Sequence, residues 1–381
     1  PRTPADVSAL ARTLLSRRGE ASGTALARGI LDAYRRLDDA GRLAVLRDFA
    51  EGFGADRDRL DAAIAAYQAE PSPAAAAALH VAAEPRRQEL IRRLNLAPHG
   101  TLALVRLRDD LLARLPDHPD LKVLDDDLVH LLSSWFNRGF LVVKRIDWST
   151  PANILEKIIR YEAVHEIRDW DDLRRRLEPE DRRCYAFFHP RLEDEPLIFV
   201  EVALTAEIPA AIGPLIAEGG TPLAADEARV AVFYSISNCQ TGLAGISFGS
   251  LLIKQVVEEL KRELPKLTTF VTLSPVPGFA KWLARERKTE TGFLLDEERL
   301  LLAALDEPEW RADVARAQKV DRLLARCAAR YFLTAKASGS RPLDPVARFH
   351  LGNGARLERI NTGADLSDTG LAQSHGVMVN Y

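Results

Sequence analysis

The sequence has little cysteine, and the cysteines that it has are scattered. Cys184, Cys239 and Cys327 lie far apart and show no C-x-x-C or C-x-x-x-H spacing. We therefore expect neither a disulfide framework nor a zinc site built on them, and a reducing compartment fits this usage. The 8 histidines are equally dispersed and no H-E-x-x-H is present. No metal site is predicted.

Long apolar runs and a charge excess of one sign are missing as well. No apolar run approaches ~18 residues, so we expect no membrane-spanning helix. With 52 Lys and Arg against 55 Asp and Glu the formal net charge is -3, and the arginines stand in mixed-sign clusters typical of solvated helix faces. No nucleic-acid partner is therefore expected. No signal peptide is visible, and because the sequence begins with Pro1 instead of Met we expect an N-terminal segment to be missing from it.

The first 138 residues show helical periodicity. Apolar residues recur there at spacings of three and four, for example over 75–96, which we treat as one helical segment. Val, Ile and Thr are sparse, and prolines and glycines separate the periodic segments. We predict a helical bundle over residues 1–138, with self-association or bracing as its role.

Strand-like runs begin near residue 139. They are rich in β-branched and aromatic residues and cover 140–146, 183–190, 196–204, 229–237 and 267–274. Helical periodicity is predicted over 152–167, 170–178 and 250–264. The short link after the second run predicts a hairpin, and the helix before the last run predicts a parallel crossover. The second part of the chain is therefore expected to be α+β.

A glycine-rich loop precedes the crossover helix. Gly242, Gly245 and Gly249 stand in "NCQTGLAGISFGS", residues 238–250. Glycine allows close backbone approach, and free N–H groups at a helix start bind anions, so the loop is a candidate pyrophosphate site. The alternative is a loop that only turns the chain, since the spacing is neither G-x-G-x-x-G nor a Walker A motif. Sheet, loop, helix and parallel strand in this order are also the core of GNAT-type acyltransferases, whose loop holds the pyrophosphate of coenzyme A.

Ser274 ends the last strand-like run, in "FVTLSPVPGF". A serine-hydrolase elbow would use the N–H of the next residue, but Pro275 has none, so an acyl-enzyme mechanism of that type is disfavoured. A rigidly held hydroxyl that donates to a ligand and a serine that caps a strand end both remain open. The candidate partner is His350, with His189 and His375 as alternatives. Spacing alone cannot pair any of them with Ser274.

Several long motifs together resemble the malonyl-CoA decarboxylase family. The resemblance covers residues 139–381, and the helical part matches that family's architecture. The motifs stand in the family's order: "HPRLEDEPLIFVEVALT", "FYSISNCQTGLAGISFGSLLIKQVVEEL", "TLSPVPGFAKWL", "FHLGNGARLERIN" and "SHGVMVNY".

The resemblance implies a helical oligomerisation domain over 1–138 and a GNAT-like, mixed-sheet catalytic domain over 139–381. It implies conversion of malonyl-CoA to acetyl-CoA and CO2 without a metal or organic cofactor, because coenzyme A is part of the substrate. Members of the family usually form tetramers, so a homotetramer is expected. An Ala- and Arg-rich, Lys-poor composition favours a bacterial source, and we expect a cytoplasmic enzyme of fatty acid metabolism.

The resemblance also implies the site residues. The family's catalytic serine falls on Ser274 and its catalytic histidine on His350. The residues implied to bind the coenzyme A ester are Gly242, Ala244, Gly245, Ile246, Ser247, Phe248, Gly249, Ser250 and Asn353. Animal members have a glutamate where this chain has Ser247, so an acid there is not part of the expected mechanism. Members generally continue past Tyr381, where this sequence stops.

We expect Ser274 and His350 to bind the malonyl carboxylate and then to protonate the enolate that is left when CO2 departs. Two rival functions fit the same loop and sheet. One is a coenzyme A-dependent N-acyltransferase, and the other is a non-catalytic acyl-CoA sensor.

Overall fold

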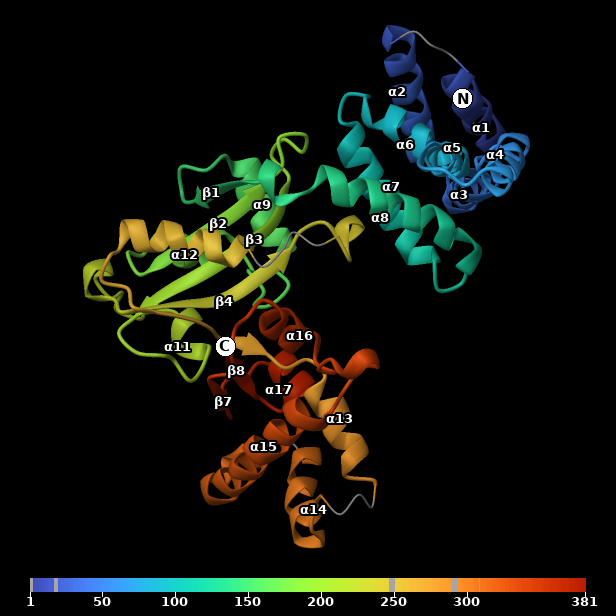
Figure 1. The fold of residues 1–381 in the computed structure, drawn as a ribbon. Coiled ribbons are helices and arrows are strands. Elements are labelled where there is room, and N and C mark those ends of the chain that lie inside the picture. Colours follow the sequence, from blue (N-terminus) through green and yellow to red (C-terminus); the bar gives the residue numbers. More distant parts are fainter. Residues whose placement is uncertain (1–2, 17–19, 247–250, 290–292, 308) are drawn as a thin grey trace. The chain divides into compact units, whose positions relative to one another are not determined.

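The computed structural model describes the chain except residues 1–2, 17–19, 247–250, 290–292 and 308 (Figure 1). The described residues form two compact units. Unit 1 comprises those among 1–142, 188–195 and 240–248, and unit 2 those among 143–187, 196–239 and 249–381. The predicted helical N-terminal part and mixed-sheet C-terminal part are confirmed.

Unit 1 is built from helices that pack around a leucine-rich core. The α-helices are α1 Pro4–Ser16, α2 Glu20–Arg36, α3 Asp39–Gly52, α4 Arg57–Ala69, α5 Pro73–Ala83, α6 Arg86–Asn95, α7 Gly100–Arg114 and α8 Lys122–Trp135. Short 3-10 helices are η1 Pro119–Leu121, η2 Arg138–Phe140 and η4 Thr241–Leu243. Buried Leu46, Leu90, Leu94, Leu104 and Leu128 form part of the core.

Side-chain caps and prolines set the helix ends in unit 1. Asp38, Asp56 and Ser72 each accept a hydrogen bond from a backbone N–H in the first turn of α3, α4 and α5, which satisfies donors that the helix itself leaves free. The prediction of one helical segment over 75–96 is wrong, because Pro85 separates α5 from α6. Proline lacks an N–H and disfavours helical geometry in the residue before it.

Unit 2 centres on a mixed sheet with strand order β1-β2-β3-β4-β5. Its strands are β1 Val142–Ile146, β2 Arg182–Phe188, β3 Pro196–Thr205, β4 Val230–Asn238 and β5 Thr269–Thr272. β3 and β4 are antiparallel, whereas β4 and β5 are parallel. The predicted crossover between these two strands is confirmed, with α12 as its helix.

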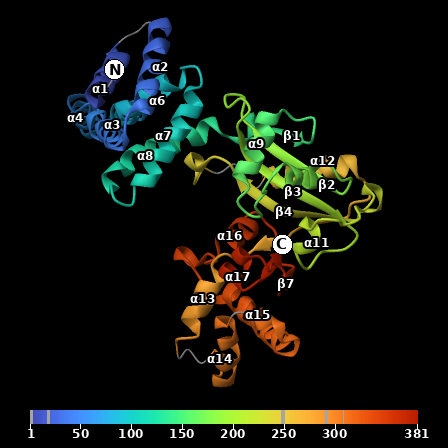
Figure 2. The ribbon, with the colours of Figure 1, turned by 180° about the vertical axis from the view of Figure 1, so that it is seen from behind.

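Helices surround this sheet and a second, smaller one. The α-helices of unit 2 are α9 Ala152–Tyr161, α10 Trp170–Leu177, α11 Gly213–Ile216, α12 Leu251–Glu263, α13 Phe279–Glu286, α14 Asp296–Leu302, α15 Val314–Thr334, α16 Pro345–Gly352 and α17 Asp368–Ser374. Its 3-10 helices are η3 Ala225–Glu227, η5 Ala303–Asp306, η6 Trp310–Ala312 and η7 Ser338–Ser340. α12 lies along one face of the large sheet, in front of the strands in Figure 1 and behind them in Figure 2.

β4 and β5 diverge after only four residue pairs. Phe233 is the last β4 residue that pairs with β5, opposite Thr272, whereas β4 stays paired with β3 as far as Asn238. Glu201 pairs with Ser235 and Val202 with Phe233, so Tyr234 is the extra residue of a β-bulge. A bulge bends the strand that carries it, and the edge of β4 beyond Phe233 is left without β5 beside it.

After β5 the chain turns away from β4 and enters a smaller sheet, whose order is β6-β8-β7. Its strands are β6 Ser274–Pro275, β7 Arg359–Asn361 and β8 Met378–Asn380. Ser274 pairs with Val379 of β8. This sheet and the helices α13 to α15 beneath it were not predicted from the sequence, because strands of two or three residues are too short to show periodicity.

A separate apolar core supports the smaller sheet. Phe279 and Trp282 of α13 pack on Tyr331 of α15, with ring centroids 5.8 and 5.2 Å from the tyrosine ring. Val276 and Val379 belong to the same buried cluster. The short strand that presents Ser274 is therefore fixed by side-chain packing on the helices as well as by strand pairing.

Candidate active site

Ser274 and His350 meet in unit 2. Ser274 Oγ lies 3.3 Å from His350 Nε2, although 76 residues separate them in the sequence. Both side chains are buried, at 6% and 4% exposure. His375 instead ends α17, and the ring of His189 contacts the carbonyl of Trp135 in unit 1. Of the three predicted histidines, His350 is the one that the structure brings to Ser274.

The divergence of β4 and β5 explains the position of Ser274. Leu273 N still donates to Phe233 O, at 3.0 Å, but the next residue already pairs with β8. Ser274 therefore stands at the point where the two strands separate. Its hydroxyl donates to Thr272 Oγ1 at 2.8 Å, and Tyr381 N donates to the same oxygen at 3.3 Å.

His350 is presented by α16, which the Asp344 side chain caps by accepting from Ala347 N at 2.8 Å. The Tyr381 ring stacks on the imidazole, with centroids 4.7 Å apart and planes 22° apart. Burial lowers the pKa of His350 to about 4, because an apolar environment disfavours the charged form. The imidazole is therefore neutral near pH 7, with one ring nitrogen protonated and the other free to accept.

His350 lines two cavities, and Ser274 lines the smaller of them. The larger, of about 560 Å³, lies against α12 and β5 and is lined by His350, Thr272 and Tyr381, with Asn353 and Lys254 among its polar residues. The smaller, of about 270 Å³, lies beside the free edge of β4 and is mostly apolar. Its lining includes Ser274, His350, Val164, Ile198, Phe233, Ile236, Leu273, Val346 and Phe349. His350 and Phe233 contribute to both cavities.

The predicted pyrophosphate loop falls partly on described residues. Buried Arg108 of α7 donates to Gly242 O at 2.7 Å and to Ala244 O at 2.8 Å. The same guanidinium forms an ion pair with Asp125 at 2.8 Å. A Cβ on Gly242 would lie 1.9 Å from Val105 O, so this glycine permits close backbone packing. No sequence pattern pointed to the Arg108 contact, because an arginine on a helix is usually solvated.

The other predicted substrate-binding residues have different positions. Gly245 adopts φ +78°, and Ile246 is buried. Asn353 follows α16 and lines the larger cavity with His350. Ser247, Phe248, Gly249 and Ser250 lie outside the described residues. The assignment of these nine residues to coenzyme A stays a prediction.

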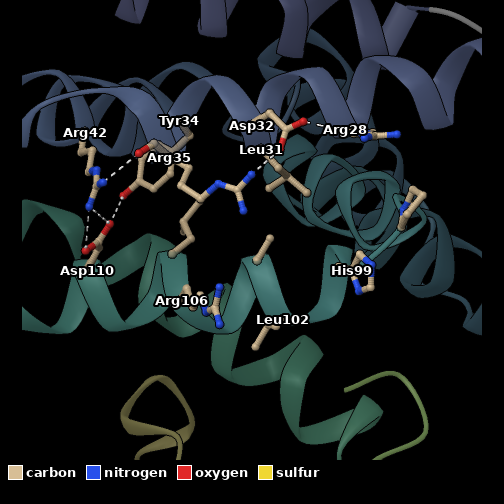
Figure 3. Close-up of a pocket in the computed structure, with 13 residues that line it drawn as sticks. Arg28, Leu31, Asp32, Tyr34, Arg35, Arg42, His99, Leu102, Arg106 and Asp110 are labelled. Carbon is tan, nitrogen blue, oxygen red and sulfur yellow. Dashed lines mark hydrogen bonds and ion pairs between the residues drawn. The ribbon is translucent and has the colours of Figure 1, made fainter. Parts of the chain in front are cut away.

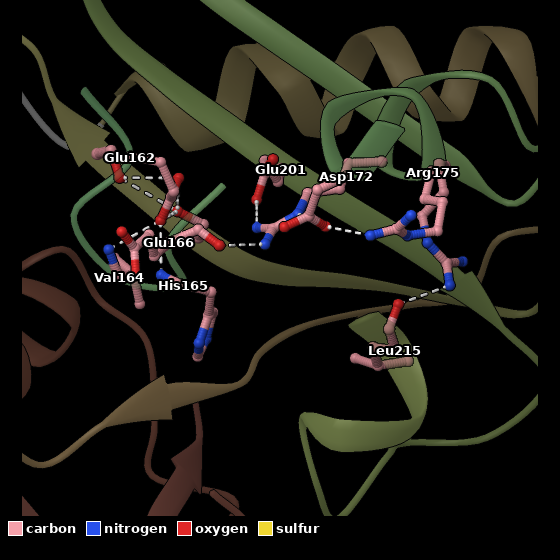
Figure 4. A network of polar contacts seen from close by, with 12 residues as sticks. Glu162, Val164, His165, Glu166, Asp172, Arg175, Glu201 and Leu215 are labelled. Carbon is pink, nitrogen blue, oxygen red and sulfur yellow. Dashed lines mark hydrogen bonds and ion pairs between the residues drawn. The ribbon is translucent and has the colours of Figure 1, made fainter. Parts of the chain in front are cut away.

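A buried polar network adjoins the smaller cavity through Val164, which lines that cavity (Figure 4). Glu162 accepts from Ser235 Oγ and Ser237 Oγ of β4, and from the backbone N–H groups of Val164 and His165 at 2.8 Å. The predicted helix over 152–167 in fact ends at Tyr161, because this carboxylate turns the following backbone. Val164, a wall residue of the cavity, is held by that turn.

The same network continues to β3 (Figure 4). Arg176 of α10 donates to Glu201 at 3.1 Å and to Glu166 O at 2.9 Å, and lies 3.6 Å from Asp172. Glu201 is fully buried, and burial followed by the nearby Glu162 charge raises its pKa to about 8. The sequence pattern of "RDWDDLRRRLEPEDRR" indicated a solvated helix face, and for Arg176 and Asp172 this is wrong.

A third cavity, of about 490 Å³, lies in unit 1 between α2 and α7 (Figure 3). Its two carboxylates already have partners: Asp110 accepts from Tyr34 and from Arg42, both at 3.2 Å, and Asp32 pairs with Arg35 at 2.8 Å. The described residues that line it include neither serine nor cysteine. We therefore place the candidate active site at Ser274 and His350.

Within the described ranges, no cluster of three or more His, Cys, Asp or Glu side chains could hold a metal ion. In the same part of the chain, no helix has both the length and the apolar character that a membrane crossing requires.

Comparison with protein families gives two matches. The family model for the malonyl-CoA decarboxylase C-terminal domain matches residues 139–381. The model for the malonyl-CoA decarboxylase N-terminal domain matches residues 53–136.

Relatives resemble the chain over most of its length. The mitochondrial malonyl-CoA decarboxylase of Anser anser anser is 37% identical over 382 residues, covering 91% of this chain and 75% of that protein. The Rattus norvegicus enzyme of the same name is 36% identical, covering 93% and 77%. The crystal structure of malonyl-CoA decarboxylase from Rhodopseudomonas palustris is 62% identical with a TM-score of 0.96, covering 100% of this chain and 93% of that one. The structure from Agrobacterium vitis is 59% identical with a TM-score of 0.95, covering 99% and 92%.

Proposed function

The chain belongs to the malonyl-CoA decarboxylase family, and we propose that it converts malonyl-CoA to acetyl-CoA and CO2 at the Ser274–His350 pair. The observation that carries the site assignment is the buried 3.3 Å contact between Ser274 Oγ and His350 Nε2. His350 lines both cavities and Ser274 lines the smaller one.

The reaction needs no nucleophile. When the bond between the α-carbon and the carboxylate breaks, CO2 leaves and the electron pair stays on the α-carbon, delocalised into the thioester oxygen as an enolate. The enolate carbon then takes up one proton. The protein has to hold the carboxylate out of the thioester plane and to deliver that proton. Pro275, which cannot complete a hydrolase oxyanion hole, is compatible with this chemistry.

His350 is the proton source in this mechanism. Its pKa of about 4 in the free protein means that the ring enters the reaction neutral. The malonyl carboxylate brings a negative charge beside it, and an opposite charge raises a histidine pKa. His350 then takes one proton from solvent and returns one to the enolate carbon through Ser274 Oγ, so that the ring ends neutral. General acid help of this kind contributes about 10²- to 10⁴-fold in rate.

The smaller cavity suits the malonyl head group. Ser274 and His350 give it a polar wall, and apolar side chains such as Phe233, Ile236 and Val346 form most of the rest. A carboxylate placed there loses hydration, whereas the departing CO2 is neutral and small. A fixed, mostly apolar environment in place of water favours cleavage of the bond to the carboxylate, because that step disperses the negative charge.

The larger cavity suits the coenzyme A arm. It begins at His350 and extends along α12 and β5 to Lys254, Asn353 and Arg356. Cationic and amide side chains there fit a phosphate-bearing chain. The glycine loop from Gly242 to Ser250 is proposed to bind the pyrophosphate, as the family resemblance implies. Coenzyme A belongs to the substrate, and we propose neither a metal nor an organic cofactor.

The biological setting is part of the same proposal. Bacterial proteins of known structure are 62% and 59% identical to this chain, which supports a bacterial source. A cytoplasmic location and a place in fatty acid metabolism are proposed with it. We propose a homotetramer that associates through its helical unit. Light scattering on the purified protein tests the oligomeric state, and a monomer in dilute solution would contradict it.

One assay separates the proposed reaction from its rivals. The protein is incubated with malonyl-CoA alone, and CO2, acetyl-CoA and free thiol are measured. A decarboxylase forms CO2 and acetyl-CoA in equal amounts with no free thiol. An N-acyltransferase releases thiol only when an amine is added, and a sensor binds malonyl-CoA without turnover.

A further inference from the structure

We propose that Thr272 is a positioning residue that captures the Ser274 hydroxyl proton and thereby fixes the tautomer of His350. Ser274 Oγ donates to Thr272 Oγ1 at 2.8 Å and lies 3.3 Å from His350 Nε2. All three side chains are buried. Thr272 therefore decides which nitrogen of the imidazole carries the proton.

The tautomer follows from the number of protons that the serine hydroxyl and the imidazole each carry. A serine hydroxyl has one proton and two lone pairs. With its proton donated to Thr272, Ser274 Oγ can only accept from His350. His350 Nε2 must then be the protonated nitrogen, and Nδ1 the free one. A neutral imidazole has only one N–H, so the tautomer is determined.

Thr272 is held firmly enough for this role. Its backbone N donates to Tyr381 O at 3.0 Å, and its carbonyl accepts from Asn380 Nδ2 at 2.9 Å. Its Oγ1 also accepts from Tyr381 N at 3.3 Å. Thr272 is β-branched, and β-branched side chains have few allowed χ1 rotamers. The oxygen that accepts from Ser274 is therefore held in place by Asn380 of β8 and by Tyr381, the residue that follows it.

The chosen tautomer places the transferable proton where the reaction uses it. This consequence rests on the proposed function. With Nε2 already protonated, the proton taken up from solvent goes to Nδ1. Ser274 then turns its hydroxyl from Thr272 to the enolate carbon: its O–H bond breaks, a C–H bond forms, and His350 Nε2–H restores the hydroxyl. The transfer leaves the ring in the Nδ1–H form, which returns to the Nε2–H form by exchanging its proton with solvent. In the opposite tautomer Nδ1 would already carry its proton and the Nε2 lone pair would accept from Ser274, so the ring could take up a proton only after that hydrogen bond broke.

Thr272→Val tests the inference, because valine keeps the shape of the side chain and removes the acceptor. The ring nitrogens of His350 are observed by ¹⁵N NMR in the ligand-free protein, and assigned by their loss in His350→Asn. We expect a protonated Nε2 in wild type and in Thr272→Ser. In Thr272→Val the Ser274 proton turns to Nε2, and the ring changes to the Nδ1–H form. An unchanged Nε2–H tautomer in Thr272→Val overturns the proposal.

Kinetics provide the second readout. We expect kcat of Thr272→Val to fall about 10- to 100-fold with an unchanged KM, and Thr272→Ser to restore most of it. Thr268→Val removes a hydroxyl just outside β5 and is the matched control, with kcat unchanged. Equal losses in Thr272→Ser and Thr272→Val would contradict the role of the hydroxyl. A wild-type protein without turnover would instead refute the proposed function, and the NMR result would stand independently.

Discussion

Tyr381 covers one face of the His350 ring: the two rings stack 4.7 Å apart with an angle of 22°. Tyr381 also lines the larger cavity and donates its backbone N–H to Thr272 Oγ1. Its phenol oxygen is buried and has no hydrogen-bond partner among the described residues. We infer that the ring shields the imidazole from water, whereas its hydroxyl makes no hydrogen bond with a described residue.

Tyr381→Phe and Tyr381→Ala separate these two parts of the side chain. We expect Tyr381→Phe to keep kcat within about threefold of wild type, since the stacked ring remains. Tyr381→Ala opens one side of His350 to water, which raises its pKa toward the usual value because burial is the cause of its depression. NMR titration of His350 and steady-state kinetics measure both effects. A pKa that stays near 4 in Tyr381→Ala would contradict this explanation.

Ser274→Ala and His350→Asn test the proposed chemistry directly. Each removes a group that we propose binds the carboxylate and moves the proton, so kcat should fall by about 10²- to 10⁴-fold. Acetyl-CoA formation from malonyl-CoA is the measurement. His80→Asn and Ser338→Ala change the same residue types at exposed positions of α5 and η7 and serve as matched controls. Wild-type turnover in either active-site variant would exclude the assigned roles.

Stability should fall as the pH is lowered from about 6.5 to about 4. The pKa of His165 and that of His350 are both lowered to about 4, chiefly by burial. Between pH 4 and the ordinary histidine value of about 6.5 the unfolded chain binds protons that the folded protein does not, so the free energy of unfolding rises with pH across this window. Each histidine contributes on the order of 3 kcal/mol when the window is fully crossed.

Urea unfolding of wild type and His350→Asn at pH 7, 6 and 5 measures this effect. The variant should lose part of the pH dependence, because asparagine does not titrate. His80→Asn, which changes an exposed histidine, should keep the wild-type slope. Equal slopes in wild type and His350→Asn would show that His350 is not depressed in the folded state.

Arg176→Met should destabilise unit 2, and more strongly at high pH. The guanidinium is the ion-pair partner of the fully buried Glu201. With Arg176 present the pKa of Glu201 is about 8, and without it the pKa rises further, because a buried carboxylate then lacks its counter-charge. Above the unfolded value of about 4.5 the folded protein binds the extra proton, so stability falls as pH rises.

Unfolding free energies at pH 6 and pH 8.5 provide the measurement. We expect a loss of about 3–5 kcal/mol for Arg176→Met at the higher pH and less at the lower. The double variant Arg176→Met, Glu201→Gln should recover part of the lost free energy of unfolding. It should also remove most of the pH dependence that Arg176→Met alone introduces. A loss that is equal at both pH values would mean that Glu201 is not the group left without a partner.

The residues of the candidate site could be proposed from the sequence, but their arrangement could not. Ser274 and His350 could be nominated from motifs, and the parallel crossover from the helix between two strand-like runs. Their 3.3 Å contact depends on the chain turning away from β4 after β5, so that β6 pairs with β8, and strands this short show no periodicity. Buried Arg108 and Arg176 look like surface arginines in sequence, since only tertiary packing provides their partners.

Gly242→Ala should be more damaging than Gly245→Ala, the same substitution at the other described glycine of the loop. A Cβ there would lie 1.9 Å from Val105 O, so the backbone must move, and the two bonds from Arg108 to Gly242 O and Ala244 O would be disturbed. We expect a loss of about 1–3 kcal/mol or more from overpacking. Gly245→Ala, with open space around its Cβ but φ +78°, should lose about 1–2 kcal/mol from backbone strain alone.

Gly29→Ala is the matched control within unit 1. This glycine lies inside α2, and an added Cβ would meet no atom within 4 Å, so alanine should be neutral or stabilise the helix by about 0.5–1 kcal/mol. Urea unfolding followed by far-ultraviolet circular dichroism ranks the three variants. If Gly242→Ala were as stable as Gly29→Ala, the close packing of the loop on α7 would be wrong. A normal stability for Gly242→Ala with a raised KM for malonyl-CoA would instead assign this glycine to substrate binding alone.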